Sequence, residues 1–282
     1  MVEKFAVIGG GLMGSGIAEV TAKAGIDTIV AEISADAAAA AKAKVEGSIE
    51  RAVSRGKLES SDAEAVLGRI TYVDDLDALA DRDLVLEAAS ENEKIKLELF
   101  ERVGGLLGPD AILASNTSSI PISNLGAASG RPDKVLGIHF FNPAPVMQLV
   151  ELIPSLTTSP ETLSTVKTFV ADTLGKEPIE ATDRAGFVVN ALLVPYIFSA
   201  IRMFEGGHAT AEDIDTGMKL GCGHPMGPLT LADMVGLDTL RAIGDSMYDE
   251  FKEPLYAAPP LLERMVAAGR LGKKSGHGFY TY

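Results

Sequence analysis

The hydrophobic residues of the first thirty positions follow two different periods. Lys4–Ile8 (KFAVI) is a short apolar run, typical of a strand buried on both faces of a parallel sheet. A glycine-rich stretch follows, and the apolar spacing over Leu12–Ala24 then predicts a helix that stops at Gly25. Ile26–Ala31 (IDTIVA) predicts a second strand. Together these segments predict one complete βαβ unit.

The alternation of strands and helices continues after this unit. We expect helices over residues 35–55 and 93–103, and another that begins at Ser159-Pro160 and stops near Gly175. Further strands are expected over the apolar runs Asp83–Glu87, Ala111–Ala114, Lys134–Phe140 and Met147–Ile153. This order predicts an α/β fold with a Rossmann-type doubly wound, mostly parallel sheet.

The pattern after residue 184 is helical throughout. Residues 186–205 form a long apolar stretch interrupted by Pro195, which predicts a kinked helix. Thr210 with Asp213 resembles a capping box, and two more helices are expected over residues 229–243 and 260–268. We therefore expect two domains: a Rossmann-type domain over residues 1–184 and an all-helical domain over residues 185–282.

Composition and charge exclude several classes of partner. The chain of 282 residues has a formal net charge of −14, which argues against binding to nucleic acid and against docking on an anionic membrane. Its single cysteine, Cys222, cannot form an internal disulfide and is expected to be a small packing residue. The N-terminal residues lack the features of a secretory signal, so we expect a cytoplasmic protein.

The glycine-rich turn after the first strand is the first candidate site. It reads GGGLMG and contains Gly9, Gly11 and Gly14 in the spacing G-x-G-x-x-G, between a strand and a helix. In a dinucleotide site these glycines permit a tight turn, close approach of the pyrophosphate and close packing of helix on strand. Leu12 and Met13 begin the helix whose free N–H groups would face the phosphates. The alternative is a purely structural turn.

Glu32 follows the second strand and lies 18 residues after Gly14. This is near the position at which Rossmann-type folds place the acid that binds a ribose 2′-hydroxyl. A carboxylate there would repel the additional phosphate of NADP, so we expect a preference for NAD. The alternative is a solvated acid at the end of a strand.

His139 is the histidine whose setting suggests chemistry. It lies near the end of the expected strand KVLGIHF, at the carboxyl edge of the sheet, where open sheets bind ligands. Glu151 follows twelve residues later. The segment between them contains two prolines that would let the chain reverse and bring imidazole and carboxylate together. Such a pair is suited to acid–base catalysis, although spacing alone leaves a satisfied core histidine as an equal alternative.

Two further polar residues depend more on context. Asn190 lies within the apolar stretch 186–205, where a buried amide must find a partner, so a functional and a structural role are both open. Ser118 alone is one hydroxyl in a polar loop. The remaining histidines and Cys222 lack the spacing of metal ligands, and we expect no metal.

Six ordered motifs over nearly the whole chain resemble the L-3-hydroxyacyl-CoA dehydrogenase family, particularly its bacterial 3-hydroxybutyryl-CoA dehydrogenases. The motifs are IGGGLMGSGIA, ASNTSSI, GIHFFNPAPVMQLVE, AGFVVNALLVPY, DIDTGMKLGCGHPMGP and LGKKSGHGFYTY. The resemblance implies that His139 is the catalytic base and Glu151 its partner. It also implies that Ser118 and Asn190 contact the reacting oxygen of the substrate.

The resemblance extends to binding residues. It implies further cofactor contacts at Glu91, Lys96, Ser118, Asn142 and Lys274, and a CoA phosphate contact at Lys57. Without it, Glu91 and Lys96 are interpreted as the exposed, charged start of a helix, and Lys57 as a solvated lysine.

The implied function is the NAD-dependent interconversion of a short-chain (S)-3-hydroxyacyl-CoA, such as 3-hydroxybutyryl-CoA, and its 3-ketoacyl-CoA partner. The apolar helices after Gly186 exceed what a small free-standing domain would expose, so we expect a homodimer formed through the helical domain. We also expect this domain to contribute to the substrate site. Two alternatives are open: a dehydrogenase of a related hydroxy acid such as L-gulonate, and a non-catalytic NAD-binding structural or sensing protein.

Overall fold

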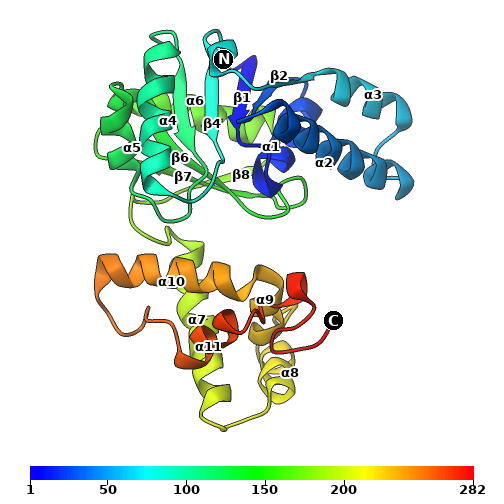
Figure 1. The fold of residues 1–282 in the computed structure, drawn as a ribbon, viewed down its shortest axis with the longest axis vertical. Coiled ribbons are helices and arrows are strands. Elements are labelled where there is room, and N and C mark those ends of the chain that lie inside the picture. The colour runs from blue at the N-terminus through cyan, green and yellow to red at the C-terminus, as the bar shows by residue number, and fades with distance from the viewer. The chain divides into compact units, whose positions relative to one another are not determined.

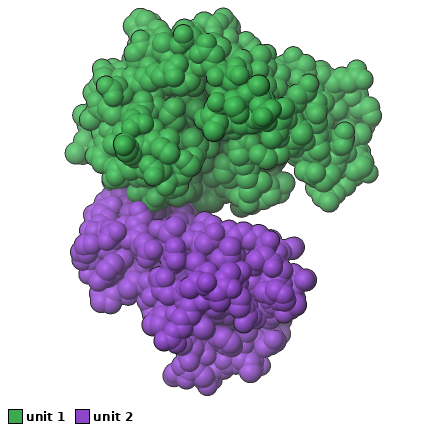
Figure 2. Space-filling view, viewed as in Figure 1, with its two compact units in different colours: residues 1–183 green, residues 184–282 purple.

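The chain folds into two compact units. The computed structural model describes all 282 residues. The first unit is Met1–Asp183 and the second Arg184–Tyr282, a division one residue from the expected domain boundary. Figure 1 shows the secondary structure, and Figure 2 colours the first unit green and the second purple. None of the helices combines the length and the apolar character that a bilayer crossing requires.

An eight-stranded sheet forms the centre of the first unit, in the order β3-β2-β1-β4-β5-β6-β7-β8. Strands β1 to β6 are parallel, β7 runs antiparallel to β6, and β8 is parallel to β7. The strands are β1 Lys4–Ile8, β2 Asp27–Ala31, β3 Ile70–Val73, β4 Leu84–Glu87, β5 Ile112–Ser115, β6 Val135–Phe140, β7 Leu149–Pro154 and β8 Glu177–Glu180. The order reverses between β1 and β4, and doubly wound sheets bind ligands at that point.

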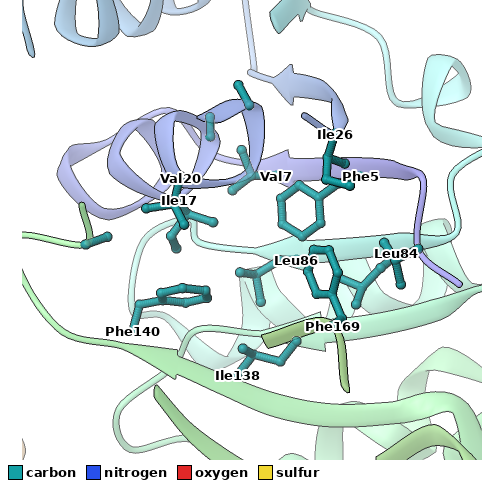
Figure 3. Packing of buried hydrophobic residues seen from close by; sticks show 14 of the residues in the cluster. Phe5, Val7, Ile17, Val20, Ile26, Leu84, Leu86, Ile138, Phe140 and Phe169 are labelled. Atoms are coloured by element: carbon teal, nitrogen blue, oxygen red, sulfur yellow. The ribbon is translucent and has the colours of Figure 1, made fainter. Parts of the chain in front are cut away.

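Helices cover both faces of this sheet. They are α1 Leu12–Lys23, α2 Ala35–Ser54, α3 Ser60–Gly68, α4 Glu93–Leu106, α5 Ile122–Ser129 and α6 Pro160–Thr168, with the short helical turns η1 Leu76–Leu79, η2 Pro132–Lys134 and η3 Phe169–Thr173. Side chains of α1, α2, α3, α6 and η3 share one core cluster with the strands. Figure 3 shows its centre, where the rings of Phe5 and Phe169 stack with centroids 6.1 Å apart.

Side chains alternate between the two faces of the sheet along β4, and this alternation places α4 on the face opposite the core cluster of Figure 3. Leu84 and Leu86 enter the cluster of Figure 3, and burial of each contributes about 1.5–3 kcal/mol. Glu87, the next residue, points the other way and binds Lys96 of α4. Successive residues of a strand face opposite sides, so α4, with α5 packed against it, covers the second face.

The second unit is helical, as expected. Its helices are α7 Val189–Glu205, α8 Ala211–Cys222, α9 Pro228–Val235, α10 Leu237–Phe251 and α11 Pro260–Ala267, followed by the turn η4 Lys273–Ser275. The single helix expected over residues 229–243 is wrong, because Gly236 adopts a φ of +102° and separates α9 from α10. The expected capping residue Thr210 does accept a hydrogen bond from the backbone N–H of Asp213.

Candidate active site

His139 and Glu151 are directly opposite one another across the antiparallel pair β6 and β7. The imidazole Nδ1 lies 2.7 Å from Glu151 Oε2. His139 is 5% exposed and Glu151 fully buried, so the pair is shielded from bulk water. The loop 141–148 reverses the chain between the two strands, which brings residues twelve apart in sequence into one cross-strand pair. The carboxylate accepts from Nδ1 and thereby orients the ring.

The other ring nitrogen faces a polar turn. His139 Nε2 lies 3.1 Å from Ser118 Oγ, and the ring of Phe141 packs edge-on with its centroid 4.7 Å from that of His139. With Nδ1 donating to Glu151, Nε2 is the nitrogen that can exchange a proton with a ligand. The hydroxyl of Ser118 is therefore beside the one ring atom at which acid–base chemistry can occur.

The glycine turn has the shape that a dinucleotide requires. A Cβ on Gly14 would lie 1.8 Å from the carbonyl oxygen of Gly9, so only glycine lets α1 begin this close to β1. A Cβ on Gly11 would meet nothing within 4 Å, which leaves open space beside the backbone. No side chain caps α1, and Leu12 at its start is exposed. The first-turn N–H groups and the positive end of the helix dipole are therefore available to a pyrophosphate.

Glu32 lies over this turn, at the end of β2. Its Oε1 accepts a hydrogen bond of 2.6 Å from the backbone N–H of Gly10, and its Oε2 accepts one of 3.2 Å from that of Ile33. The carboxylate is thus held beside the phosphate-binding turn, where a ribose hydroxyl can donate to it. These residues fit a nicotinamide dinucleotide.

Glu91 lies in the loop after β4, and Lys96 lies in the first turn of α4. Lys96 is 1% exposed, so its interpretation as an exposed helix-start lysine is wrong. Its Nζ lies 2.6 Å from Glu87 Oε1 and 3.2 Å from Glu91 Oε2. Burial raises the pKa of Glu91, but the charge of Lys96 and hydrogen bonds from Thr117 and Ser118 outweigh it and hold that pKa below its ordinary value of 4.5.

This shift predicts how Glu91→Gln changes acid stability. A carboxylate whose pKa is lower in the folded state adds stability that is fully present above its unfolded pKa and is lost as the pH falls through the folded pKa. The unfolding free energy of the wild type should therefore exceed that of the variant by a constant amount above about pH 5, and the difference should shrink below it. Urea unfolding between pH 3 and 7 measures this, and a difference that grows on acidification would contradict it.

The remaining residues indicated by the sequence lie in loops of the first unit or in the second unit. Asn142 is exposed in the loop after β6, and Lys57 is exposed in the bend between α2 and α3. Asn190 and Lys274 belong to the second unit, where Lys274 Nζ lies 2.6 Å from Asp238 Oδ1. Asn190 lies in α7, as its second residue, and is half-buried.

Two corrections concern residues that the sequence describes poorly. Cys222, expected to pack in the interior, is exposed at the end of α8. The sequence motifs do not indicate Glu87 as a site residue. It is nevertheless fully buried and accepts three hydrogen bonds, from Ala89, Lys96 and Ser115. The available signal was a carboxylate at the end of an otherwise apolar strand, which must find partners when buried.

Comparisons with known proteins agree with this geometry. Residues 4–184 match the family described as 3-hydroxyacyl-CoA dehydrogenase, NAD binding domain, and residues 186–282 match its C-terminal domain. The chain is 52% identical over 282 residues to 3-hydroxybutyryl-CoA dehydrogenase of Mycobacterium tuberculosis, with 100% of this chain and 99% of that protein covered.

Solved structures give the same result. The crystal structure of M. tuberculosis FadB2 matches with a TM-score of 0.99 at 52% identity, covering 100% of this chain and 99% of that one. The (S)-3-hydroxybutyryl-CoA dehydrogenase PaaH1 from Ralstonia eutropha matches with a TM-score of 0.95 at 44% identity and the same coverage. With both domains matched in order and a His–Glu pair at the carboxyl edge of a Rossmann-type sheet, this chain belongs to the 3-hydroxyacyl-CoA dehydrogenase family.

Proposed function

We propose that this chain interconverts (S)-3-hydroxybutyryl-CoA and acetoacetyl-CoA with NAD. The observation that carries the proposal is the buried His139–Glu151 pair, with Ser118 Oγ 3.1 Å from the second imidazole nitrogen, Nε2. The family membership supports an acyl-CoA substrate. Relatives that are 52% and 44% identical over the full chain are named 3-hydroxybutyryl-CoA dehydrogenase, and another at 44% is named hydroxyacyl-coenzyme A dehydrogenase.

The residues of the first unit account for the proton transfer. A bound nicotinamide supplies an acceptor for the hydride that leaves the carbon of a secondary alcohol. Nε2 of His139 takes the hydroxyl proton as the carbonyl forms, and Glu151 stabilises the imidazolium through Nδ1. In the reductive direction the imidazolium returns the proton to the carbonyl oxygen. Ser118 Oγ positions that oxygen at Nε2, and we assign Asn190 of the second unit to the same oxygen on the family resemblance.

The proposed site for the cofactor begins at the glycine turn. Gly9, Gly11 and Gly14 would shape it, and the first turn of α1, with Leu12 and Met13, would face the pyrophosphate. Glu91, Lys96, Ser118, Asn142 and Lys274 are proposed as the further contacts that the resemblance implies.

We predict a preference for NADH over NADPH. A 2′-phosphate would face the carboxylate of Glu32 beside Gly10, and like charges at that separation repel. The ratio of kcat/KM for NADH to that for NADPH should exceed about tenfold, which corresponds to about 1.4 kcal/mol. Steady-state assays with both cofactors measure the ratio, and a preference for NADPH would reject the assignment of Glu32.

An anionic substrate such as a CoA ester has a suitable neighbouring surface. A pocket of about 530 Å³ lies between α1, α2 and the loop after β6, and Lys44 and Arg51 line it. Lys44 Nζ also donates to the carbonyl oxygen of Gly10 at 3.1 Å. Lys57 lies just after the end of α2. Together, Lys44, Arg51 and Lys57 supply local positive charge on a chain of net charge −14, and such a surface attracts phosphate groups.

The decisive assay compares substrates. Oxidation of NADH should proceed with acetoacetyl-CoA, and reduction of NAD with L-gulonate should be at background. Turnover of gulonate in preference to the acyl-CoA would reject the proposed substrate, and no turnover with either would favour a non-catalytic protein. An acyl-CoA series from four to sixteen carbons then defines the chain-length range.

We further propose a homodimer through the second unit. Its surface exposes large apolar side chains, more than a small free-standing helical unit ordinarily leaves in water. They include Val188, Leu192, Met203, Leu220, Met234, Tyr248 and Leu255. Sedimentation at micromolar concentration should give the mass of a dimer, twice 29.5 kDa. A monomer under these conditions would contradict this proposal.

A further inference from the structure

A buried polar network lies beneath the turn that carries Ser118. It consists of Glu87, Lys96, Glu91, Ser115 and Thr117, and we call it the Glu87 network. Glu87, Lys96, Ser115 and Thr117 are each at most 1% exposed. Burying charges is costly unless they are paired and hydrogen-bonded, so a network of this kind persists only when every member has its partners. The charges of Glu87, Lys96 and Glu91 sum to −1.

The first connection from Glu87 to the turn runs through a hydroxyl. Glu87 and Ser115 are neighbours at the carboxyl ends of β4 and β5. Ser115 Oγ donates to Glu87 Oε2 at 2.6 Å and accepts from the backbone N–H of Thr117 at 3.2 Å. Because a hydroxyl has one proton, its donation to Glu87 leaves its lone pairs directed at Thr117. The carboxylate therefore sets the direction in which Ser115 holds the turn.

The second connection runs through Lys96. This ammonium bridges Glu87, at 2.6 Å, and Glu91, at 3.2 Å. Glu91 Oε1 in turn accepts hydrogen bonds from the hydroxyl of Thr117, the backbone N–H of Ser118 and the hydroxyl of Ser119. The side chain of Glu91 is 44% exposed, and the buried ammonium of Lys96 supplies it with a fixed cationic partner. Glu87 thus reaches the turn from two sides.

We propose that Glu87 is a positioning residue, which holds the turn 117–119 so that Ser118 Oγ stays at His139 Nε2. The catalytic consequence rests on the proposed function. Loss of the Glu87 charge leaves Lys96 with Glu91 as its only carboxylate, so Glu91 is drawn toward the ammonium and away from the N–H of Ser118. Both connections to the turn are then weakened, while the core of the sheet is unchanged.

The kinetic test uses Glu87→Gln, which keeps the shape of the side chain and removes its charge. At saturating NADH, kcat should fall about 10–100-fold while KM for acetoacetyl-CoA changes less than about threefold, because the substrate still binds but the reacting oxygen is misplaced. In a Ser118→Ala background the same change should lower kcat further by less than about threefold, because two residues acting through one contact are not additive. Equal losses in both backgrounds would overturn the proposal.

Arg82→Met is the matched control. Arg82 is likewise buried, at 7% exposure, and pairs with Asp27 and Asp81 near the amino ends of the strands. Its removal should lower the melting temperature but leave kcat within about twofold, because it does not touch the turn. If Arg82→Met reduces kcat as much as Glu87→Gln does, the effect is general destabilisation and the proposal fails.

A second measurement does not depend on activity. Amide hydrogen exchange followed by NMR should show the N–H groups of Thr117 and Ser118 exchanging about tenfold faster or more in Glu87→Gln than in the wild type, with the amides of β1 unchanged. Unchanged exchange at both amides would overturn the proposal. A wild-type protein inactive toward acetoacetyl-CoA would reject the proposed function, and the amide exchange would still decide whether Glu87 holds the turn.

Ser115→Ala serves if Glu87→Gln does not fold. It removes one of the two connections and no charge. We expect faster exchange at Thr117 and a loss in kcat of about threefold that is absent in the Ser118→Ala background. No change in either quantity would overturn the proposal.

Discussion

Replacing His139 with glutamine should lower kcat by about 10²–10⁴-fold, the range that general acid–base catalysis supplies. Glutamine can still bond to Glu151, but it cannot exchange a proton at the position of Nε2, 3.1 Å from Ser118 Oγ. The affinity for NADH should stay within about threefold, because the glycine turn and Glu32 are unaffected. Absorbance assays of NADH oxidation with acetoacetyl-CoA give kcat. The fluorescence of NADH itself reports binding in this chain, which has no tryptophan.

The matched control is His277→Gln. His277 is exposed near the C-terminus, and its backbone pairs with Gly272 and Thr281, so its imidazole has no role in the proposed chemistry. Its kcat should equal that of the wild type. Turnover retained by His139→Gln, or lost equally in both variants, would remove His139 from the mechanism.

The second large effect is expected for Glu151→Gln. The amide oxygen can still accept from Nδ1, so the orientation of the ring is retained while the charge that stabilises the imidazolium is lost. Exchange of carboxylate for amide in the serine-protease triad lowers kcat by about 10⁴, and we expect a loss of about 10²–10⁴ here.

Glu180→Gln is the matched control for Glu151→Gln, because it removes a carboxylate from the neighbouring strand but not from the imidazole. Glu180 lies on β8, the strand next to β7, but it is exposed and pairs with Lys167. This variant should retain the wild-type kcat. If Glu151→Gln stays within about threefold of the wild type, the carboxylate does not take part in stabilising the imidazolium.

Much of the first unit was predictable, because its elements have local signals. The strands β1, β2, β4 and β6 are runs of apolar residues long enough for burial on both faces, and α1 and α2 have helical spacing with natural stops. The βαβ unit with its glycine turn was therefore recognisable from adjacent residues alone. The fold class and the family followed from this order and from motifs that occur in sequence.

Elements stabilised by distant residues escaped prediction. Helix α5 has no local side-chain cap, and its first N–H groups, at Ile122 and Ser123, are capped by Asp183, about sixty residues later in the chain. Strand β8 (EPIE) lacks apolar alternation and is a strand because β7 pairs with it. The break at Gly236 depends on a backbone angle that glycine permits but does not require.

The sequence by itself determined which residue types were present at the site and their order: the glycine turn, Glu32, His139 and Glu151. Only the tertiary structure decided that β7 pairs antiparallel with β6, so that His139 and Glu151 are cross-strand partners. The distance between His139 Nδ1 and Glu151 Oε2 is then 2.7 Å. It also decided that Lys96 is buried against Glu87 rather than solvated. The physical reason is that hydrophobic periodicity reports burial of a helix or strand face, whereas a buried polar pair depends on register between segments far apart in the chain.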